Sequence, residues 1–149
     1  MKRERLKKQF PQSMTGNIRA MQESILRDFF SGAANAVALR ADLVGAVVAT
    51  NPSSTSQNIV EMSTDFELQP EHLIKLCNAV LAHELEPDDL ETIGFCLLAS
   101  DHFLWDGNIP PGDVVSETIH DWSAPEINFR LTVDSVQKFR KRLLTGNDF

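Results

Sequence analysis

The sequence predicts a mainly α protein, a single-domain bundle of five or six helices with at most a short strand pair. Apolar residues recur at intervals of three and four in several segments. Candidate helix caps flank those segments, and clusters of Pro, Gly and Ser separate them. At 149 residues the chain can bury about two-thirds of the surface that its unfolded form exposes. We therefore expect one globular domain over residues 1–149.

A basic arm and a helix are expected in the first forty residues. Residues 1–14 contain a run of Lys and Arg that predicts a flexible, solvated arm. From Asn17, a candidate N-cap, apolar residues follow one helical stripe until Ser31 and Gly32 end it. The stripe comprises Ile18, Met21, Ile25 and Phe29.

The next segments mix helix and strand signals. Residues 33–49 are rich in Ala and Val, and their length favours a second helix, with a strand at 46–49 as the alternative because consecutive valines favour sheet. Residues 51–58 contain Pro and four Ser or Thr residues, which predict an internal loop. Residues 59–68 alternate in polarity, so a short extended segment is possible there.

Three further helices are predicted in the second half of the chain, besides a central one. Pro70 suits the first turn of a helix, Val115 to Trp122 give the apolar face of another, and Thr132 is a candidate N-cap for the last. Turn-rich residues 106–112 connect the central helix to the second of these. The inward stripes are expected to be Leu73, Leu76, Cys77, Val80 and Leu81; Val115, Thr118, Ile119 and Trp122; and Val133, Val136, Phe139 (or Arg140) and Leu143.

The central helix is expected over residues 88–102 and to be largely buried. Pro87 and the acids after it suit a helix start, where negative charge is favourable. The apolar stripe contains Leu90, Ile93, Leu97 and Leu98, with Gly94 on the same face. Acids surround the start of this helix, which we call its acidic entrance. An aromatic residue and an acid, Trp105 and Asp106, follow its end.

Charge is distributed very unevenly along the chain. Residues 1–40 carry eight Lys or Arg, and residues 130–149 carry five. Residues 41–129 carry sixteen acids and Lys75 alone, so 16 − 1 leaves that segment at −15. This pattern disfavours nucleic-acid binding, which requires clustered cations, and favours a basic protein partner. The alternative is that the basic ends fold back on the acidic middle.

Several kinds of chemistry are disfavoured by the sequence. Ser100, Asp101 and His102 are adjacent, and neighbouring helical residues point about 100° apart, so they cannot form a catalytic triad. Cys77 and Cys96 lie in apolar runs without a CxxC motif, which indicates buried thiols rather than a zinc site. No metal ligands, catalytic residues or cofactor are assigned. No apolar run approaches the length of a membrane span, and no signal-peptide core follows the basic start, so a cytoplasmic protein is expected.

The candidate partner-binding residues are acids of the central segment and one tryptophan. Acids attract Arg and Lys of a partner, and a large ring can fill a pocket in an interface. For Trp105, beside a predicted turn, an anchor and a core position are equally expected, whereas Trp122 is expected in the core. The candidates are Glu84, Glu86, Asp88, Asp89, Glu91, Asp101, Trp105, Asp106 and Asp113.

Two segments carry a resemblance to a known class of proteins. IGFCLLASDHFLWD at residues 93–106 and DWSAPEIN at residues 121–128, with the final helix, resemble small acidic bacterial immunity proteins of toxin–immunity systems. The similarity covers roughly residues 60–146. It implies a non-enzymatic inhibitor that masks the active site of a basic toxin, such as a nuclease.

Two other functions stay open. A metal-dependent enzyme would bring His83 and His102 together with nearby carboxylates, because carboxylate oxygens suit hard cations. A self-associating structural protein, such as a homodimer, would pair the basic ends of one copy with the acidic middle of another.

Overall fold

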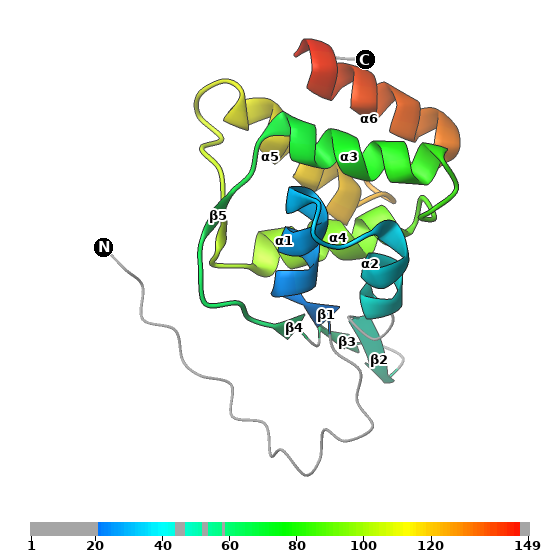
Figure 1. The fold of residues 1–149 in the computed structure, drawn as a ribbon. Helices are drawn as coiled ribbons and strands as arrows, with labels where there is room; N and C mark the ends of the chain where they lie inside the picture. The colour runs from blue at the N-terminus through cyan, green and yellow to red at the C-terminus, as the bar shows by residue number, and fades with distance from the viewer. Residues whose placement is uncertain (1–20, 44–46, 52–53, 58, 147–149) are drawn as a thin grey trace.

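The computed structural model describes residues 21–43, 47–51, 54–57 and 59–146 (Figure 1). Within these ranges the chain forms six helices and six short strands, so the mainly α class is confirmed. In order they are β1 (Met21–Gln22), α1 (Glu23–Ser31), α2 (Ala36–Leu43), β2 (Val47–Asn51), β3 (Ser54–Gln57), β4 (Ile59–Val60), β5 (Phe66–Glu67), α3 (Pro70–Leu81), α4 (Asp89–Ala99), β6 (Phe103–Leu104), α5 (Gly112–Ser123) and α6 (Val133–Thr145).

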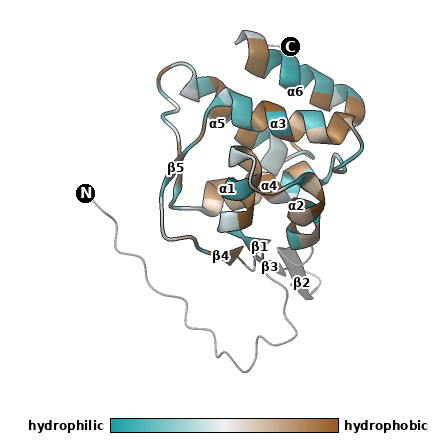
Figure 2. Ribbon diagram, in the orientation of Figure 1, coloured by the Kyte–Doolittle hydropathy of each residue, from teal (hydrophilic) through white to brown (hydrophobic). Residues whose placement is uncertain are grey.

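Helix α5 lies at the centre of the helical packing. It contacts α3, α4 and α6, and the predicted stripe from Val115 to Trp122 is fully buried. The indole of Trp122 meets the ring of Phe139 edge-on, with centroids 6.2 Å apart. All six helices contribute to one hydrophobic cluster, and in Figure 2 brown apolar stretches alternate with teal hydrophilic ones along the helices. The described helices therefore share one core.

Helices α3 and α6 lie side by side and run in opposite directions (Figure 1). Thr132 caps α6 as predicted: its hydroxyl accepts a hydrogen bond from Ser135 N–H at 3.0 Å, and the Ser135 hydroxyl accepts one from Thr132 N–H. Gly146 ends α6 in the left-handed conformation that glycine adopts without steric cost. Of the predicted α6 stripe, Val136, Phe139 and Leu143 are buried, but Val133 is exposed because it lies in the first turn, at the edge of the interface.

Two segments in the first half of the chain differ from the prediction. The predicted helix over 33–49 is α2 followed by β2, so the alternative of a strand near 46–49 is correct for residues 47–49. Part of the predicted loop over 51–58 is β3, which pairs with β2 in an antiparallel hairpin. Backbone pairing has overridden the turn composition of this segment.

The first helix also begins later than its periodicity predicts. Met21 belongs to β1, which pairs in parallel with β4, and α1 begins at Glu23. Gln22 rather than Asn17 precedes the helix, and Asn17 and the predicted arm over 1–14 lie outside the described residues. Gly32 ends α1 at φ 92° as expected.

Strand pairing in the described ranges consists of three two-stranded sheets, more than the single short pair predicted. In the third, Phe66 of β5 is in register with Phe103 of β6. These rings pack around Phe30, at centroid distances of 5.8 and 5.9 Å. Each pairing joins segments that are remote in sequence or separated by a turn, which local periodicity cannot detect.

Candidate partner-binding surface

Five of the nine predicted residues are gathered at the entrance to α4. Glu84 and Glu86 lie on the α3–α4 connection, Asp88 is the residue before the helix, and Asp89 and Glu91 are in its first turn. The Asp89 carboxylate accepts a hydrogen bond from Glu86 N–H at 2.8 Å, which fixes the chain entering the helix. The predicted acidic entrance is therefore present.

The other four residues lie beyond the opposite end of α4. The helix ends at Ala99 rather than at the predicted His102, because the Ser100 hydroxyl accepts hydrogen bonds from His102 and Phe103 N–H and turns the chain. Asp101, Trp105, Asp106 and Asp113 follow, on the connection to α5 and in its first turn. Figure 1 shows that connection and the α3–α4 connection at opposite sides of the molecule. The nine residues thus form two groups.

Trp105 is half-buried and packs against the edge of the core. The ring therefore contributes to folding, while part of it still faces solvent. Trp122, in contrast, is fully buried, as predicted.

One base from the amino-terminal region does fold back on the acidic entrance. The Arg40 guanidinium lies 3.6 Å from the Glu86 carboxylate and 3.7 Å from that of Asp89. Both contacts are longer than a charge-assisted hydrogen bond, and the Arg40 side chain is half-exposed, so they contribute little stability. Within the described part of the chain, Asp88 and Glu91 form no ion pair of this kind.

Helices α4 and α5 pack so closely that one more acid, Glu126, comes near Asp88 and Glu91. A Cβ atom on Gly94 would lie 3.1 Å from Ser123 N and 3.2 Å from Trp122 Cβ. The turn after α5, closed by Ile127 N–H donating to Ala124 O, therefore starts beside α4. Burial raises the pKa of Glu91, and the carboxylates of Glu126 and Asp88 raise it further. Glu126, 35 residues from Glu91, could not be found from periodicity.

Apolar side chains continue this surface along α4. Phe95 and Leu98 lie four and seven residues after Glu91, on the same side of the helix. They are 36% and 38% exposed, so the prediction that Leu98 belongs to the buried stripe is wrong. The core side is instead formed by Leu90, Ile93, Gly94, Cys96 and Leu97. We define the α4 surface as Asp88, Glu91, Phe95, Leu98 and Glu126.

The histidines do not converge in the way that the enzyme alternative requires. His83 precedes α4 and His102 follows it, and eleven helical residues span about 16 Å. The Nδ1 atom of His102 lies 2.9 Å from the Asp65 carboxylate, so this ring nitrogen already has a hydrogen-bond partner. Among the residues that the structure describes, no group of three or more His, Cys, Asp or Glu side chains could hold a metal ion.

A cavity of about 460 Å³ opens between α3 and the α1–α2 connection. The Lys75 ammonium lies 4.9 Å over the Phe29 ring at this cavity. Asn78, also in its wall, accepts a hydrogen bond from Arg140 Nε at 2.7 Å. Glu84 is the predicted site residue that lines it.

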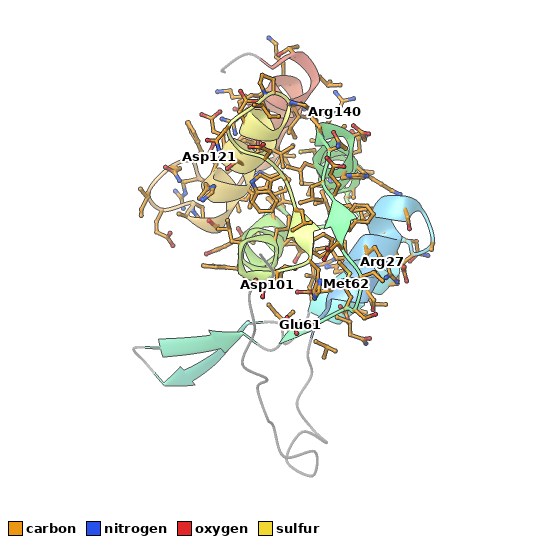
Figure 3. All side chains as sticks on the ribbon, turned by 90° about the vertical axis from the view of Figure 1, so that its left-hand side faces the viewer. Arg27, Glu61, Met62, Asp101, Asp121 and Arg140 are labelled. Carbon is orange, nitrogen blue, oxygen red and sulfur yellow. The ribbon has the colours of Figure 1, made fainter. Side chains whose placement is uncertain are left out.

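An ion pair missed by the sequence analysis is buried between α5 and α6. The Arg142 guanidinium donates hydrogen bonds to the Asp121 carboxylate at 2.8 Å and to the Thr118 hydroxyl at 2.9 Å. The Arg142 side chain, in the last turn of α6, is only 4% exposed. Figure 3 shows Asp121 on α5, close to α6.

Both cysteines are buried free thiols, as predicted. Burial raises the pKa of Cys77 and of Cys96 to about 12, and the nearby Glu23 and Asp42 carboxylates add to the shift at Cys96. Because the thiolate is the reactive form, we expect neither cysteine to react with a thiol reagent such as DTNB in the folded protein at about pH 8. Both should react rapidly in denaturant, and fast labelling of native protein would contradict the prediction.

The burial of His72 leads us to expect that the folded protein loses stability in mild acid. Its ring packs against Phe66 and Phe30, with centroids 4.9 and 5.4 Å away, and its Nδ1 accepts a hydrogen bond from Gln69 N–H. Burial lowers its pKa from 6.5; the Lys75 charge also lowers it, and Glu71 opposes the shift. The neutral ring is therefore favoured in the folded state. Its contribution is fully present above pH 6.5 and is lost as pH falls towards and through the lowered folded pKa.

The measurement for this pH prediction is urea denaturation at several pH values between neutral and mildly acidic. The wild-type protein should lose more stability across this range than a His72→Gln variant, whose side chain does not titrate. Parallel losses in the two proteins would assign the pH dependence to other groups.

In the described ranges, no helix combines the length and apolar character needed to cross a membrane. Comparison with known protein families, curated proteins and solved structures finds no match. Function must therefore be argued from the residues of the chain itself.

Proposed function

We propose that this chain is a non-enzymatic acidic module that binds a basic protein in the cytoplasm. By its resemblance to small acidic bacterial immunity proteins, the partner is a toxin, such as a nuclease, whose active site the module masks. The observation that carries the proposal is the crowding of Asp88, Glu91 and Glu126 from two elements beside exposed apolar side chains. Crowded carboxylates gain free energy when a cation approaches.

Electrostatic complementarity explains why such a surface suits a nuclease inhibitor. A nuclease must be cationic where it binds phosphate, so an acidic inhibitor is steered to the same groove. The −15 charge of residues 41–129 supplies the long-range attraction. Arg40 neutralises part of the entrance to α4, at Glu86 and Asp89, and leaves the α4 surface as the stronger candidate.

The test begins with capture of a partner from an extract of the native host on the immobilised protein. The captured protein should be basic, and one equivalent of this chain should abolish its activity. An Asp88→Lys, Glu91→Lys, Glu126→Lys variant should associate about tenfold to a hundredfold more slowly at low salt. Its association rate should also depend less steeply on salt, as stopped-flow measurements would show.

A matched variant separates local charge from total charge. Glu61→Lys, Glu67→Lys, Asp134→Lys makes the same change in net charge at exposed acids of other elements. The association rate of this variant should fall much less than that of the variant with three lysines on the α4 surface. Equal losses in the two variants would remove the assignment of the site, and a partner that keeps its activity when bound would contradict the inhibitor function.

A further inference from the structure

Apolar side chains cover two sides of α4, and the core needs only one of them. Leu90, Ile93 and Leu97 are fully buried on the core side. Phe95 and Leu98 lie three residues apart on the solvent side, where Phe95 follows Glu91 by one helical turn. Single exposed apolar residues are common on protein surfaces. An adjacent pair in line with a carboxylate cluster is the arrangement of an interface, with apolar anchors beside charged groups.

We propose that the α4 surface is the docking site for an amphipathic, Lys- and Arg-rich helix of the basic partner. This inference rests on the proposed function and specifies the chemistry and shape of the partner segment. Apolar residues of the incoming helix would pack on Phe95 and Leu98. Cations on the same side of that helix would meet Asp88, Glu91 and Glu126.

The dimensions of the surface define the segment that fits it. Asp88 and Leu98 are ten residues apart, which corresponds to about 15 Å along a helix. A partner helix of at least three turns is therefore required, with its cations towards one end and its apolar residues towards the other. Recognition of an amphipathic helix through anchors spaced by three and four residues is a recurrent binding mode.

Other occupants fit this surface less well. A nucleic acid would be repelled by the carboxylates. A two-fold contact with a second copy would bring the same carboxylates to both sides of the interface and no cation from the α4 surface. Burial of Glu91 without a cation would then cost free energy. A basic amphipathic helix satisfies both the apolar and the acidic parts of the surface.

The experiment is a titration of the isotopically labelled full chain with synthetic peptides, followed by NMR. The first peptide is a helix of at least three turns, and one of its faces carries Lys towards one end and Leu, at intervals of three and four, towards the other. The second is a scrambled sequence of the same composition, and the third replaces Lys with Glu. We expect the first peptide to shift the backbone amides of residues 88–99 and of Ala124, Glu126 and Ile127. The other two peptides should shift these signals far less at equal concentration.

Variants test the two parts of the surface separately. Phe95→Ser with Leu98→Ser should weaken binding of the first peptide about tenfold or more, because each tenfold corresponds to the loss of one good apolar contact. Glu91→Gln should weaken it less and reduce its salt dependence. The matched control is Val37→Ser with Ile109→Ser, since these side chains are 73% and 56% exposed on other segments. This control should bind as the wild-type protein does.

Each contrary outcome overturns the inference. Equal shifts with the scrambled peptide would mean that charge alone drives binding, and shifts confined to residues 75–84 would assign the helix to the cavity beside α3. Shifts of the α4 surface with protein concentration alone would assign it to a second copy. Wild-type affinity in the Phe95 and Leu98 variant would remove the apolar anchors. If the partner captured from the host still binds through the carboxylates, the proposed function survives and only the docked helix is lost.

Discussion

Replacement of Asp121 by Ala should lower the free energy of unfolding by about 3 kcal/mol, the largest effect expected of a polar substitution in this protein. The Arg142 guanidinium, 4% exposed, would lose the carboxylate at 2.8 Å. The Thr118 hydroxyl would remain at 2.9 Å, and the Glu117 carboxylate at 3.7 Å. These groups cannot replace a buried anion in direct contact, so α5 and α6 would be held together less strongly.

Urea denaturation of Asp121→Ala and of Glu117→Ala gives the comparison. Glu117 is 53% exposed, and its ion pair with Arg142 is long, so its removal should cost less than about 1 kcal/mol. The double variant Asp121→Leu, Arg142→Met should be more stable than Asp121→Ala, because apolar replacement of both partners leaves no buried charge. A double variant as unstable as the single one would mean that packing, rather than the buried charge, explains the loss.

Replacement of Gly94 by Val should cost about 2–3 kcal/mol through overpacking between α4 and α5. Even an alanine Cβ would lie 3.1 Å from Ser123 N and 3.3 Å from Ile119 O, and both are backbone atoms that move only with the helix. Gly94→Ala should be much milder, since alanine regains about 1 kcal/mol of helix propensity. Ala99→Val, at an exposed position of the same helix, provides the control for the added bulk.

The same substitution links stability to the candidate site. The turn that carries Glu126 starts beside α4 because α4 and α5 meet at Gly94, so separating the helices should weaken the repulsion between the Glu91 and Glu126 carboxylates. The pKa of Glu91, which burial raises first and that repulsion raises further, should then move down towards its ordinary value. NMR titration of the Glu91 side chain measures this change. A Gly94→Val protein with wild-type stability and an unchanged Glu91 pKa would contradict the close packing.

The reliable predictions from sequence were those that depend on neighbours within one helix. Pro70 and Thr132 begin their helices, and the stripe from Val115 to Trp122 is buried, because capping and periodicity act over one or two turns. The error at Leu98 has the same origin. Its spacing places Leu98 one turn after the buried Gly94, but its side chain is 38% exposed in the last turn of α4, and local spacing cannot predict where the neighbouring elements stop covering a helix.

Prediction of the candidate site was incomplete for a related reason. Glu84 to Glu91 are close in sequence, so their grouping followed from the chain itself. Asp101 to Asp113 follow the opposite end of α4, and the length of an intervening helix separates the two groups. Glu126, the acid that completes the α4 surface, reaches Glu91 only through the contact between two helices.

The mainly helical class, the starts of most helices and the strongly acidic central segment can all be read from the order of the amino acids. These properties follow from local propensity, periodicity and charge, which need no knowledge of long-range contacts. Long-range packing, in contrast, buries Arg142 against Asp121, pairs β5 with β6 and brings Glu126 within electrostatic reach of Glu91. Such choices depend on which helix faces pack together, and the free energy of that packing belongs to pairs of residues remote in sequence.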